Sequence, residues 1–357
     1  MEEKLLMTPG PTNVPQRVLN KMSEAVIHHR TAEYGRLFAE MNERIKYVFQ
    51  TKNPVLTFPA AGTGGLEASI VNMFSRGDKI LAVSTGVFGD RFIEIAKIYG
   101  LDVDTIAVPW GRGVTVDEIR EQLKDEHKGL IVTHNETSTT VTNHIREIGE
   151  FMKGKKQLFI VDGVSSIGGL EAKMDEWGID VLITASQKAL MSPPGLAFVG
   201  VSDKGWEAAK KSNNPKYYWD FLRARKFLDK PLPENPYTPA VSLISAVNEA
   251  LKMIEEEGLY NVYKRHHDLA DKFRNRTENM GLKVYTDKNY LSDTVTGFLI
   301  EEDGEASRIK KRMEQEFNIV IAGGQGNLKG KMIRVGHMGC VNDEMIDRTL
   351  DALGKCL

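Results

Sequence analysis

Short runs of apolar, β-favouring residues recur through the first half of the chain, and this recurrence restricts the fold more than any other feature. We predict strands at residues 79–83, 104–108, 129–133, 158–162 and 180–184. Several of these runs are apolar throughout, which is typical of strands that are covered on both faces. Between them lie stretches of helical periodicity that end near glycine. This alternation of strand and helix predicts an α/β fold built on a mostly parallel sheet.

The later part of the chain has a different pattern. A proline-rich stretch at residues 231–240 precedes a long amphipathic pattern at residues 241–257, which indicates a break followed by a helix. Strand candidates follow around residues 295–300 and 332–335. A chain of 357 residues has room for a second core. We therefore expect a large α/β domain followed by a smaller α+β domain.

The charge balance and the cysteine content exclude several classes of protein. The 47 Lys and Arg residues are matched by 49 Asp and Glu residues, so the charge gives no indication of binding to nucleic acid or an anionic membrane. No apolar run is long enough to cross a membrane, and the acidic N-terminus does not resemble a signal peptide. Cys340 and Cys356 have neither disulfide-scaffold nor metal-site spacing. We expect a cytoplasmic protein that acts on small molecules without a metal.

A carboxylate and an amine follow neighbouring predicted strands. Asp162 ends the run at residues 158–162, and Lys188 closes the segment Thr-Ala-Ser-Gln-Lys after the next run. Ligands of open α/β sheets bind at the carboxyl ends of strands, so both side chains could reach one crevice. Pyridoxal phosphate requires such a pair, a lysine for its aldehyde and a carboxylate for its ring nitrogen. By itself, this pair is weak evidence for a cofactor site, because most lysines are solvated and most strand-end aspartates are caps or turn residues.

A glycine-rich turn strengthens this interpretation. Residues 61–65, Ala-Gly-Thr-Gly-Gly, precede a helical pattern at residues 66–74. Backbone N–H groups and the Thr63 hydroxyl could therefore hold a phosphate at a helix N-terminus, and glycine permits close approach. The turn lacks the Walker lysine and the Rossmann glycine spacing, and by itself such a turn is usually only a loop. Its value comes from its combination with Asp162 and Lys188.

Several longer motifs stand in order along the chain: MTPGPTNVP at 7–15, HNETST at 134–139, VDGVSSIGG at 161–169, SQK at 186–188 and IRVGHMGC at 333–340. From residue 6 to about residue 339 the chain resembles the class V aminotransferases, and more narrowly their alanine-glyoxylate/serine-pyruvate branch. The resemblance implies the type I fold of pyridoxal-phosphate enzymes, with a seven-stranded-type sheet flanked by helices. It also implies an N-terminal segment crossing to the active site at 1–20, a large domain at 21–255 and a small α+β domain at 256–357.

The resemblance assigns roles around the cofactor ring. Lys188 would form the Schiff base with pyridoxal 5′-phosphate and would carry the proton during catalysis. Asp162 would contact the pyridine nitrogen, with Val164 against the ring. Phe88 occupies the stacking position at which the best-known members carry Trp, so stacking is kept with less contact area. Thr137 should reach the ring hydroxyl.

The resemblance also implies a phosphate cup and a homodimer. Gly62, Thr63 and Gln187 would hold the phosphate from one subunit. Thr238, in the segment Tyr-Thr-Pro-Ala at residues 237–240, matches a residue that the family donates across the subunit interface. We therefore expect a homodimer with shared active sites, as symmetric dimers are also the common case.

Three residues are assigned to the substrate. Arg334 would clamp the α-carboxylate bidentately, and Gly10 would lie beside the substrate. Arg30, in the sequence His-His-Arg-Thr at residues 28–31, matches a motif that helps to bind the substrate's phosphate in the related phosphoserine aminotransferases. It could recognise an acidic side chain, or it could only tie down the N-terminal segment. Many members of the alanine-glyoxylate branch keep a similar segment with small neutral substrates.

We therefore expect an aminotransferase that moves an amino group from alanine or serine to a 2-oxo acid such as glyoxylate or pyruvate, with ping-pong kinetics. The alternatives are a phosphoserine or aspartate aminotransferase that uses 2-oxoglutarate, and a non-catalytic hydrogenase-associated subunit. A cysteine desulfurase fits poorly, because Gln187 stands where those enzymes usually carry His. In addition, neither Cys340 nor Cys356 precedes Arg334.

Overall fold

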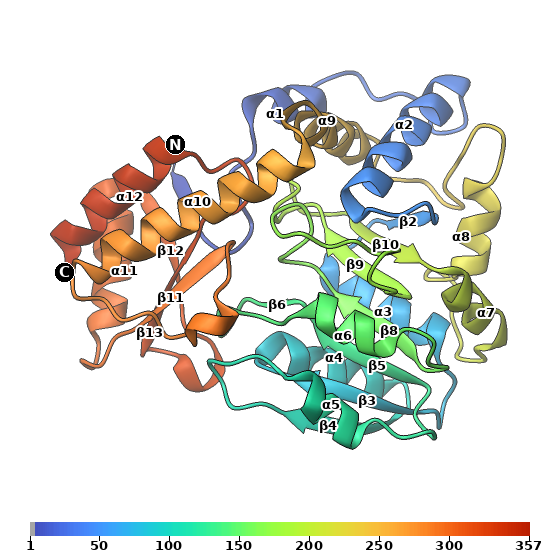
Figure 1. The fold of residues 1–357 in the computed structure, drawn as a ribbon. Helices are drawn as coiled ribbons and strands as arrows, with labels where there is room; N and C mark the ends of the chain where they lie inside the picture. The colour runs from blue at the N-terminus through green and yellow to red at the C-terminus, as the bar shows by residue number, and fades with distance from the viewer. Residues whose placement is uncertain (1–3) are drawn as a thin grey trace.

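Seven strands of residues 55–201 assemble into one sheet in a computed structural model that describes residues 4–357 (Figure 1). The strand order is β2-β10-β9-β8-β5-β3-β4. Strand β10 is antiparallel to both of its neighbours, and the other pairs are parallel. The strands are β2 (Val55–Phe58), β3 (Lys79–Ser84), β4 (Asp102–Ala107), β5 (Gly129–Thr133), β8 (Leu158–Asp162), β9 (Val181–Ala185) and β10 (Ala197–Val201).

The predicted α/β class and the mostly parallel sheet are confirmed. The runs at 129–133 and 158–162 form strands with the predicted bounds, and the other three strands differ from the predicted bounds by one or two residues at one or both ends. Strands β2 and β10 are not predicted by the apolar pattern. Strand β2 has only four residues and lies between Pro54 and Pro59, and Gly200 lowers the strand propensity of β10.

Alternate residues of the central strands face two separate cores, which explains why the strands are apolar throughout. In β3, Leu81 and Val83 belong to one core and Ile80 and Ala82 to the other. The first core is covered by α2 (Ala32–Phe49), α5 (Val116–Gln122), α6 (Ile145–Met152) and α9 (Val241–Glu257). The second core is covered by α3 (Gly62–Met73), α4 (Val87–Ile98), α7 (Asp203–Lys211) and α8 (Phe221–Leu228).

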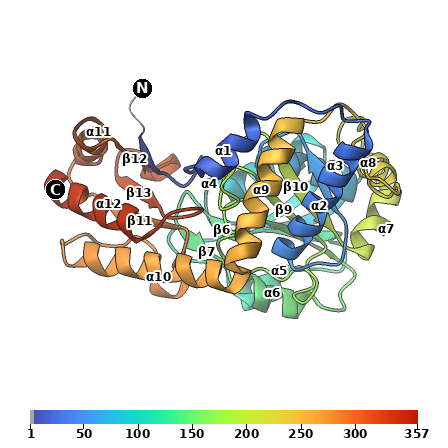
Figure 2. The ribbon, with the colours of Figure 1, turned by 90° about the horizontal axis from the view of Figure 1, so that it is seen from above.

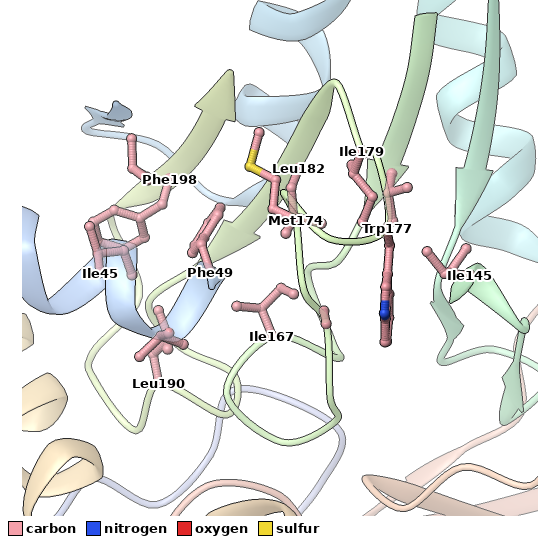
Figure 3. Packing of buried hydrophobic residues seen from close by; sticks show 14 of the residues in the cluster. Ile45, Phe49, Ile145, Ile167, Met174, Trp177, Ile179, Leu182, Leu190 and Phe198 are labelled. Atoms are coloured by element: carbon pink, nitrogen blue, oxygen red, sulfur yellow. The ribbon is translucent and has the colours of Figure 1, made fainter. Parts of the chain in front are cut away.

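Figure 3 shows part of the first core, where Ile45 and Phe49 of α2 lie close to Phe198 of β10. Helix α9 has the bounds that the amphipathic pattern predicts, and it ends at Gly258. Within residues 4–357, every helix is too short or too polar to cross a membrane.

A third core surrounds a four-stranded sheet in the order β1-β12-β13-β11. Figure 2 shows this smaller unit at one end of the molecule and the large sheet at the other. The strands of the small sheet are β1 (Leu5–Met7), β11 (Val295–Leu299), β12 (Ile319–Gly323) and β13 (Met332–Gly336). The helices beside it are α10 (Leu259–Glu278), α11 (Glu305–Phe317) and α12 (Asp343–Cys356).

The N-terminal segment connects the two units. Strand β1 pairs in parallel with β12 of the small sheet, whereas α1 (Gln16–Met22) packs against α9 of the large unit. Between them, the Thr12 N–H donates to the carbonyl of Gln187 at 3.2 Å. Because α9 packs on α2 while α10 reaches α12 and β11, we propose a division into 1–20, 21–255 and 256–357. Residues 1–3 lie outside the described part of the chain.

Candidate active site

A cavity of about 280 Å³ opens at the carboxyl ends of the central strands. Asp162 is the last residue of β8, and Lys188 follows the end of the neighbouring parallel strand β9, so both side chains arrive at the same edge of the sheet. The cavity lining includes nine of the twelve residues predicted for the site: Gly10, Gly62, Thr63, Phe88, Thr137, Asp162, Val164, Gln187 and Lys188.

The N-terminal segment closes the cavity beside Lys188. The Lys188 ammonium donates to the carbonyl of Pro9 at 2.5 Å. Gly10 has a φ of +122°, and a Cβ atom there would lie 2.7 Å from Lys188 Nζ. Only glycine combines this backbone conformation with such a close approach. The predicted place of Gly10 at the site is therefore explained by contact with the lysine.

Burial shifts the pKa values of both ionisable groups toward neutrality. Asp162 is 3% exposed, and desolvation raises the pKa of its carboxyl group to about 6. Its Oδ1 accepts a hydrogen bond from the Val164 N–H at 2.9 Å. Burial lowers the pKa of Lys188 to about 8, against the opposing attraction of Asp162. The positive charges of Arg334 and Arg91 lower the pKa of Lys188 further.

The N-terminus of α3 is open toward the cavity. This helix begins at Gly62, and no side chain caps it. The Gly64 N–H donates to the Ala61 carbonyl at 2.9 Å, which leaves the N–H groups of Gly62 and Thr63 available to an anion. Gly62 allows Val164 to pack closely, because a Cβ atom at Gly62 would lie 2.6 Å from Val164 Cγ2. The Oε1 atom of Gln187 is buried without a hydrogen-bond partner within residues 4–357. The open helix N-terminus fits a phosphate group, whereas the Gln187 Oε1 atom could accept a hydrogen bond only from a donor.

The N-terminus of α4, by contrast, is filled by the protein itself. The buried carboxylate of Glu136 accepts hydrogen bonds from the Phe88 and Gly89 N–H groups at 3.0 Å each. Ser138 Oγ accepts one from the Val87 N–H at 2.9 Å and donates to Glu136. Two side chains of the HNETST motif thus hold the first turn of α4, which carries Phe88. Sequence reasoning did not assign Glu136, although it lies inside a motif already recognised.

Thr137 connects the cavity to Arg334. The Thr137 hydroxyl donates to Ser165 Oγ at 2.9 Å, and its carbonyl accepts from Arg334 Nη1 at 2.7 Å. Arg334, in β13, also donates through Nε to the carbonyl of Gly323 at 2.9 Å. Nη2 of Arg334 donates to no group within residues 4–357, so one edge of this buried guanidinium is available. Burial lowers the pKa of Arg334 to about 10. Arg334 does not itself line the cavity.

Two predicted residues lie away from this cavity. Thr238 lines a separate small hollow that also includes Phe58 and Tyr218. Arg30 donates through Nη1 to a carboxylate oxygen of Glu234 at 2.7 Å and to the carbonyl of Asn235 at 2.8 Å. The structure therefore ties Arg30 to the segment that carries Thr238, and neither residue lines the Lys188 cavity of its own chain.

Three polar residues of the cavity lining are missing from the predicted site residues: Arg91, Asn135 and Ser165. Asn135 Nδ2 donates to Ser165 Oγ at 2.9 Å, so these two belong to the network around Thr137. Arg91 lies three residues after Phe88 on α4, and this helical spacing is the signal that could have identified it. Its guanidinium lies 4.8 Å from the centre of the Phe88 ring.

Known proteins resemble this chain in sequence and in architecture. The family model described as aminotransferase class-V matches residues 5–344. A protein named soluble hydrogenase, small subunit, from Synechococcus sp. is 41% identical over 364 residues, which cover 100% of this chain and 94% of that protein. A serine–glyoxylate aminotransferase from Methylorubrum extorquens is 38% identical over 351 residues, which cover 95% of this chain and 87% of that protein.

A solved structure of a related enzyme has the same fold as this chain. The crystal structure of alanine–glyoxylate aminotransferase from Nostoc sp. matches with a TM-score of 0.95 and 32% identity. The match covers 100% of this chain and 96% of that chain. The predicted fold, a large sheet flanked by helices with a smaller domain, is thereby confirmed.

We expect the Lys188 amine to react with a small aldehyde, under reductive trapping, with a midpoint near pH 8, because burial lowers its pKa to about that value. The neutral amine is the reactive form, so labelling should rise as the pH rises through this midpoint. Mass spectrometry of the labelled peptide measures the profile. Arg334→Gln removes a nearby positive charge and should move the midpoint upward. A midpoint near 10.5, the ordinary pKa of lysine, would contradict the prediction.

Proposed function

The chain belongs to the class V aminotransferases, and on this premise we propose that it transfers an amino group from a small neutral amino acid to a 2-oxo acid. Alanine or serine is the proposed donor, and glyoxylate or pyruvate the proposed acceptor. The transaminase activity itself follows from the family and its named members. The proposal rests above all on the convergence of Lys188, Asp162 and an uncapped helix N-terminus in one cavity.

Pyridoxal 5′-phosphate is the cofactor that we propose for this cavity, and when bound it supplies an electron-withdrawing ring conjugated to the substrate nitrogen. The open N-terminus of α3, with Thr63, would hold its phosphate. Asp162 would pair with the ring nitrogen, and Phe88 and Val164 would flank the ring. The buried Oε1 of Gln187 is an acceptor without a partner within residues 4–357, so it would bind a donor group rather than the phosphate itself, and a phosphate contact would use the Gln187 Nε2 donor.

Lys188 is the proposed base and acid of the reaction. Its lowered pKa, about 8, makes a neutral amine accessible near physiological pH, and this amine can take a proton from the substrate α-carbon and return it. The Pro9 carbonyl and the absence of a side chain at Gly10 fix where that amine lies. The free edge of Arg334 would bind the substrate α-carboxylate, as a planar guanidinium does bidentately.

The charges around the cavity support a small neutral donor. Lys188 and Arg91 are the only cationic side chains that line the described part of the cavity, and Arg91 contacts Thr63 at the phosphate end. Arg30 is engaged with Glu234 elsewhere. Within its own chain, the cavity therefore has no further cation for an acidic side chain. The relatives named above for serine and for alanine both carry glyoxylate in their names.

In the absence of acceptor, we expect the cofactor-loaded protein to form one equivalent of 2-oxo acid per subunit from alanine or serine, because the amino group then stays on the enzyme. Chromatography of the released 2-oxo acid measures this single turnover. Lys188→Ala should form none, whereas Lys97→Ala, on the exposed side of α4, should behave as wild type. No product from any amino acid would instead favour the alternative of a non-catalytic subunit like the hydrogenase-named relative.

We also propose that the protein is a homodimer that shares its active sites. Thr238 lies outside the cavity of its own chain, in a hollow beside Tyr218. Tyr217 and Tyr218 nearby are 67% and 41% exposed, and exposed aromatic side chains are typical of interface cores. A second subunit that covered this surface would receive the Thr238 hydroxyl at its phosphate site.

Mixing two inactive or weakened variants tests the shared site. Lys188→Ala subunits lack the lysine, and Thr238→Val subunits lack the donated hydroxyl. If Thr238 acts across the interface, mixed dimers contain one intact site, and random pairing should restore roughly a quarter of wild-type sites. Activity after denaturation and refolding of the mixture measures this. No restoration, or an active monomer in sedimentation, would contradict the proposal.

The alternative amino donor is an acidic amino acid, and a variant of Arg30 distinguishes it from a small neutral donor. Because Arg30 is tied to the segment that carries Thr238, it too would act at the partner's site. If it binds an acidic side chain, Arg30→Ala should lower turnover of aspartate or phosphoserine on the order of tenfold more than that of alanine or serine. Equal losses, or no wild-type turnover of acidic donors, would leave Arg30 as a structural tie.

A further inference from the structure

We propose that Arg91 recognises the phosphate group of the cofactor from within the same subunit as Lys188. This inference rests on the proposed binding of pyridoxal phosphate. A phosphate monoester carries a charge of about −1.5 to −2 at neutral pH. A helix N-terminus offers only about +0.5 of an elementary charge. The phosphate ligands predicted from the sequence, Gly62, Thr63, Gln187 and Thr238, are all uncharged, so most of the anionic charge has no counter-charge among them.

The position of Arg91 meets this need. Its Nη1 atom donates to Thr63 Oγ1 at 3.3 Å, and Thr63 lies in the first turn of α3. Helices α3 and α4 pack side by side, so the guanidinium stands next to the open helix N-terminus. Arg91 is half-buried and lines the cavity.

Arg91 also lacks an acidic partner. Within residues 4–357 no carboxylate forms an ion pair with it, and its only hydrogen bond is the one to Thr63. The arginines elsewhere in the predicted site differ, because Arg30 pairs with Glu234 and Arg334 is held by two carbonyls. A half-buried guanidinium without a counter-ion, beside free N–H donors, is suited to an anion.

Arg91 and the proposed substrate ligand Arg334 belong to different ends of the cavity. Arg334 comes from the small sheet and is held at the Thr137 wall, whereas Arg91 contacts Thr63 at the start of α3. The cofactor phosphate is the anion expected at α3. An alternative role is purely structural, because the guanidinium of Arg91 also lies 4.8 Å from the centre of the Phe88 ring. The two roles predict different ligand preferences.

Equilibrium binding of pyridoxal phosphate and of pyridoxal, which lacks the phosphate, tests the proposal on the cofactor-free protein. Absorbance titration gives both dissociation constants without any turnover. Arg91→Gln should weaken the binding of pyridoxal phosphate by roughly 10- to 100-fold, the loss expected for a charged hydrogen bond. It should change the affinity for pyridoxal by less than about twofold. Lys97→Gln, which removes a positive charge from the same helix, should leave both affinities unchanged.

Inorganic phosphate gives a second readout. It should compete with pyridoxal phosphate and raise the melting temperature of the cofactor-free wild type, and Arg91→Gln should lose both effects. Arg91→Lys keeps the charge and should retain most of the phosphate preference, which keeps the test informative if Arg91→Gln does not fold.

The outcomes separate this inference from the proposed function. If Arg91→Gln keeps the wild-type preference for pyridoxal phosphate over pyridoxal, the inference is wrong while the proposed function stands. If the substitution weakens the binding of both ligands equally, Arg91 acts only through Phe88, and the inference is again wrong. If the wild type binds neither ligand, the proposed function fails, and the inference fails with it.

Discussion

The buried carboxylate of Asp162 is the constraint on which the rest of the site depends. A carboxylate at the end of a central strand, 3% exposed and bonded to the Val164 N–H, is costly to keep charged away from water. Lys188 offsets part of this cost, but burial also disfavours its own charge. A site with two incompletely compensated charges destabilises the cofactor-free fold. The same pair is suited to a ligand that would bring a ring cation to the carboxylate and an aldehyde to the amine, as we propose for pyridoxal phosphate.

The surrounding elements hold the Asp162 and Lys188 side chains away from bulk water, which would otherwise stabilise their charges. The N-terminal segment pairs with the small sheet through β1 and with the Lys188 loop through Thr12, so both units close over the lysine. The N-termini of the neighbouring helices α3 and α4 both lie at the cavity, but only one of them is capped by the protein. Helix α4 has its N-terminus filled by Glu136 and therefore serves to position Phe88 and Arg91, whereas α3 has its N-terminus free for an anion. On the proposed binding of pyridoxal phosphate, the ring would lie at the Phe88 end of the cavity and the phosphate at the start of α3.

Much of this arrangement is predictable from the sequence, because strand ends and motifs are local. Asp162 and Lys188 follow from two neighbouring apolar runs, and the open turn at Gly62 from its glycines. The geometry that depends on distant contacts is not predictable in the same way. The carbonyl contacts of Arg334 require the small sheet to be placed against Thr137, and the Glu136 cap requires the start of α4 at residue 87. Arg30 shows the converse: its motif is recognisable, but its bond to Glu234 places it outside the cavity of its own chain.

The most direct test of this account compares the thermodynamic stability of cofactor-free wild type and Asp162→Asn as a function of pH. Desolvation raises the pKa of Asp162 from 3.8 to about 6, so the ionised carboxylate destabilises the fold, and wild-type stability should fall as the pH rises through this interval. At pH 7.5 we expect the variant to be more stable by up to about 3 kcal/mol. The difference should shrink toward zero below pH 4, and pyridoxal phosphate should stabilise the variant less than the wild type. A variant that is no more stable than the wild type at pH 7.5, or a difference independent of pH, would contradict the account.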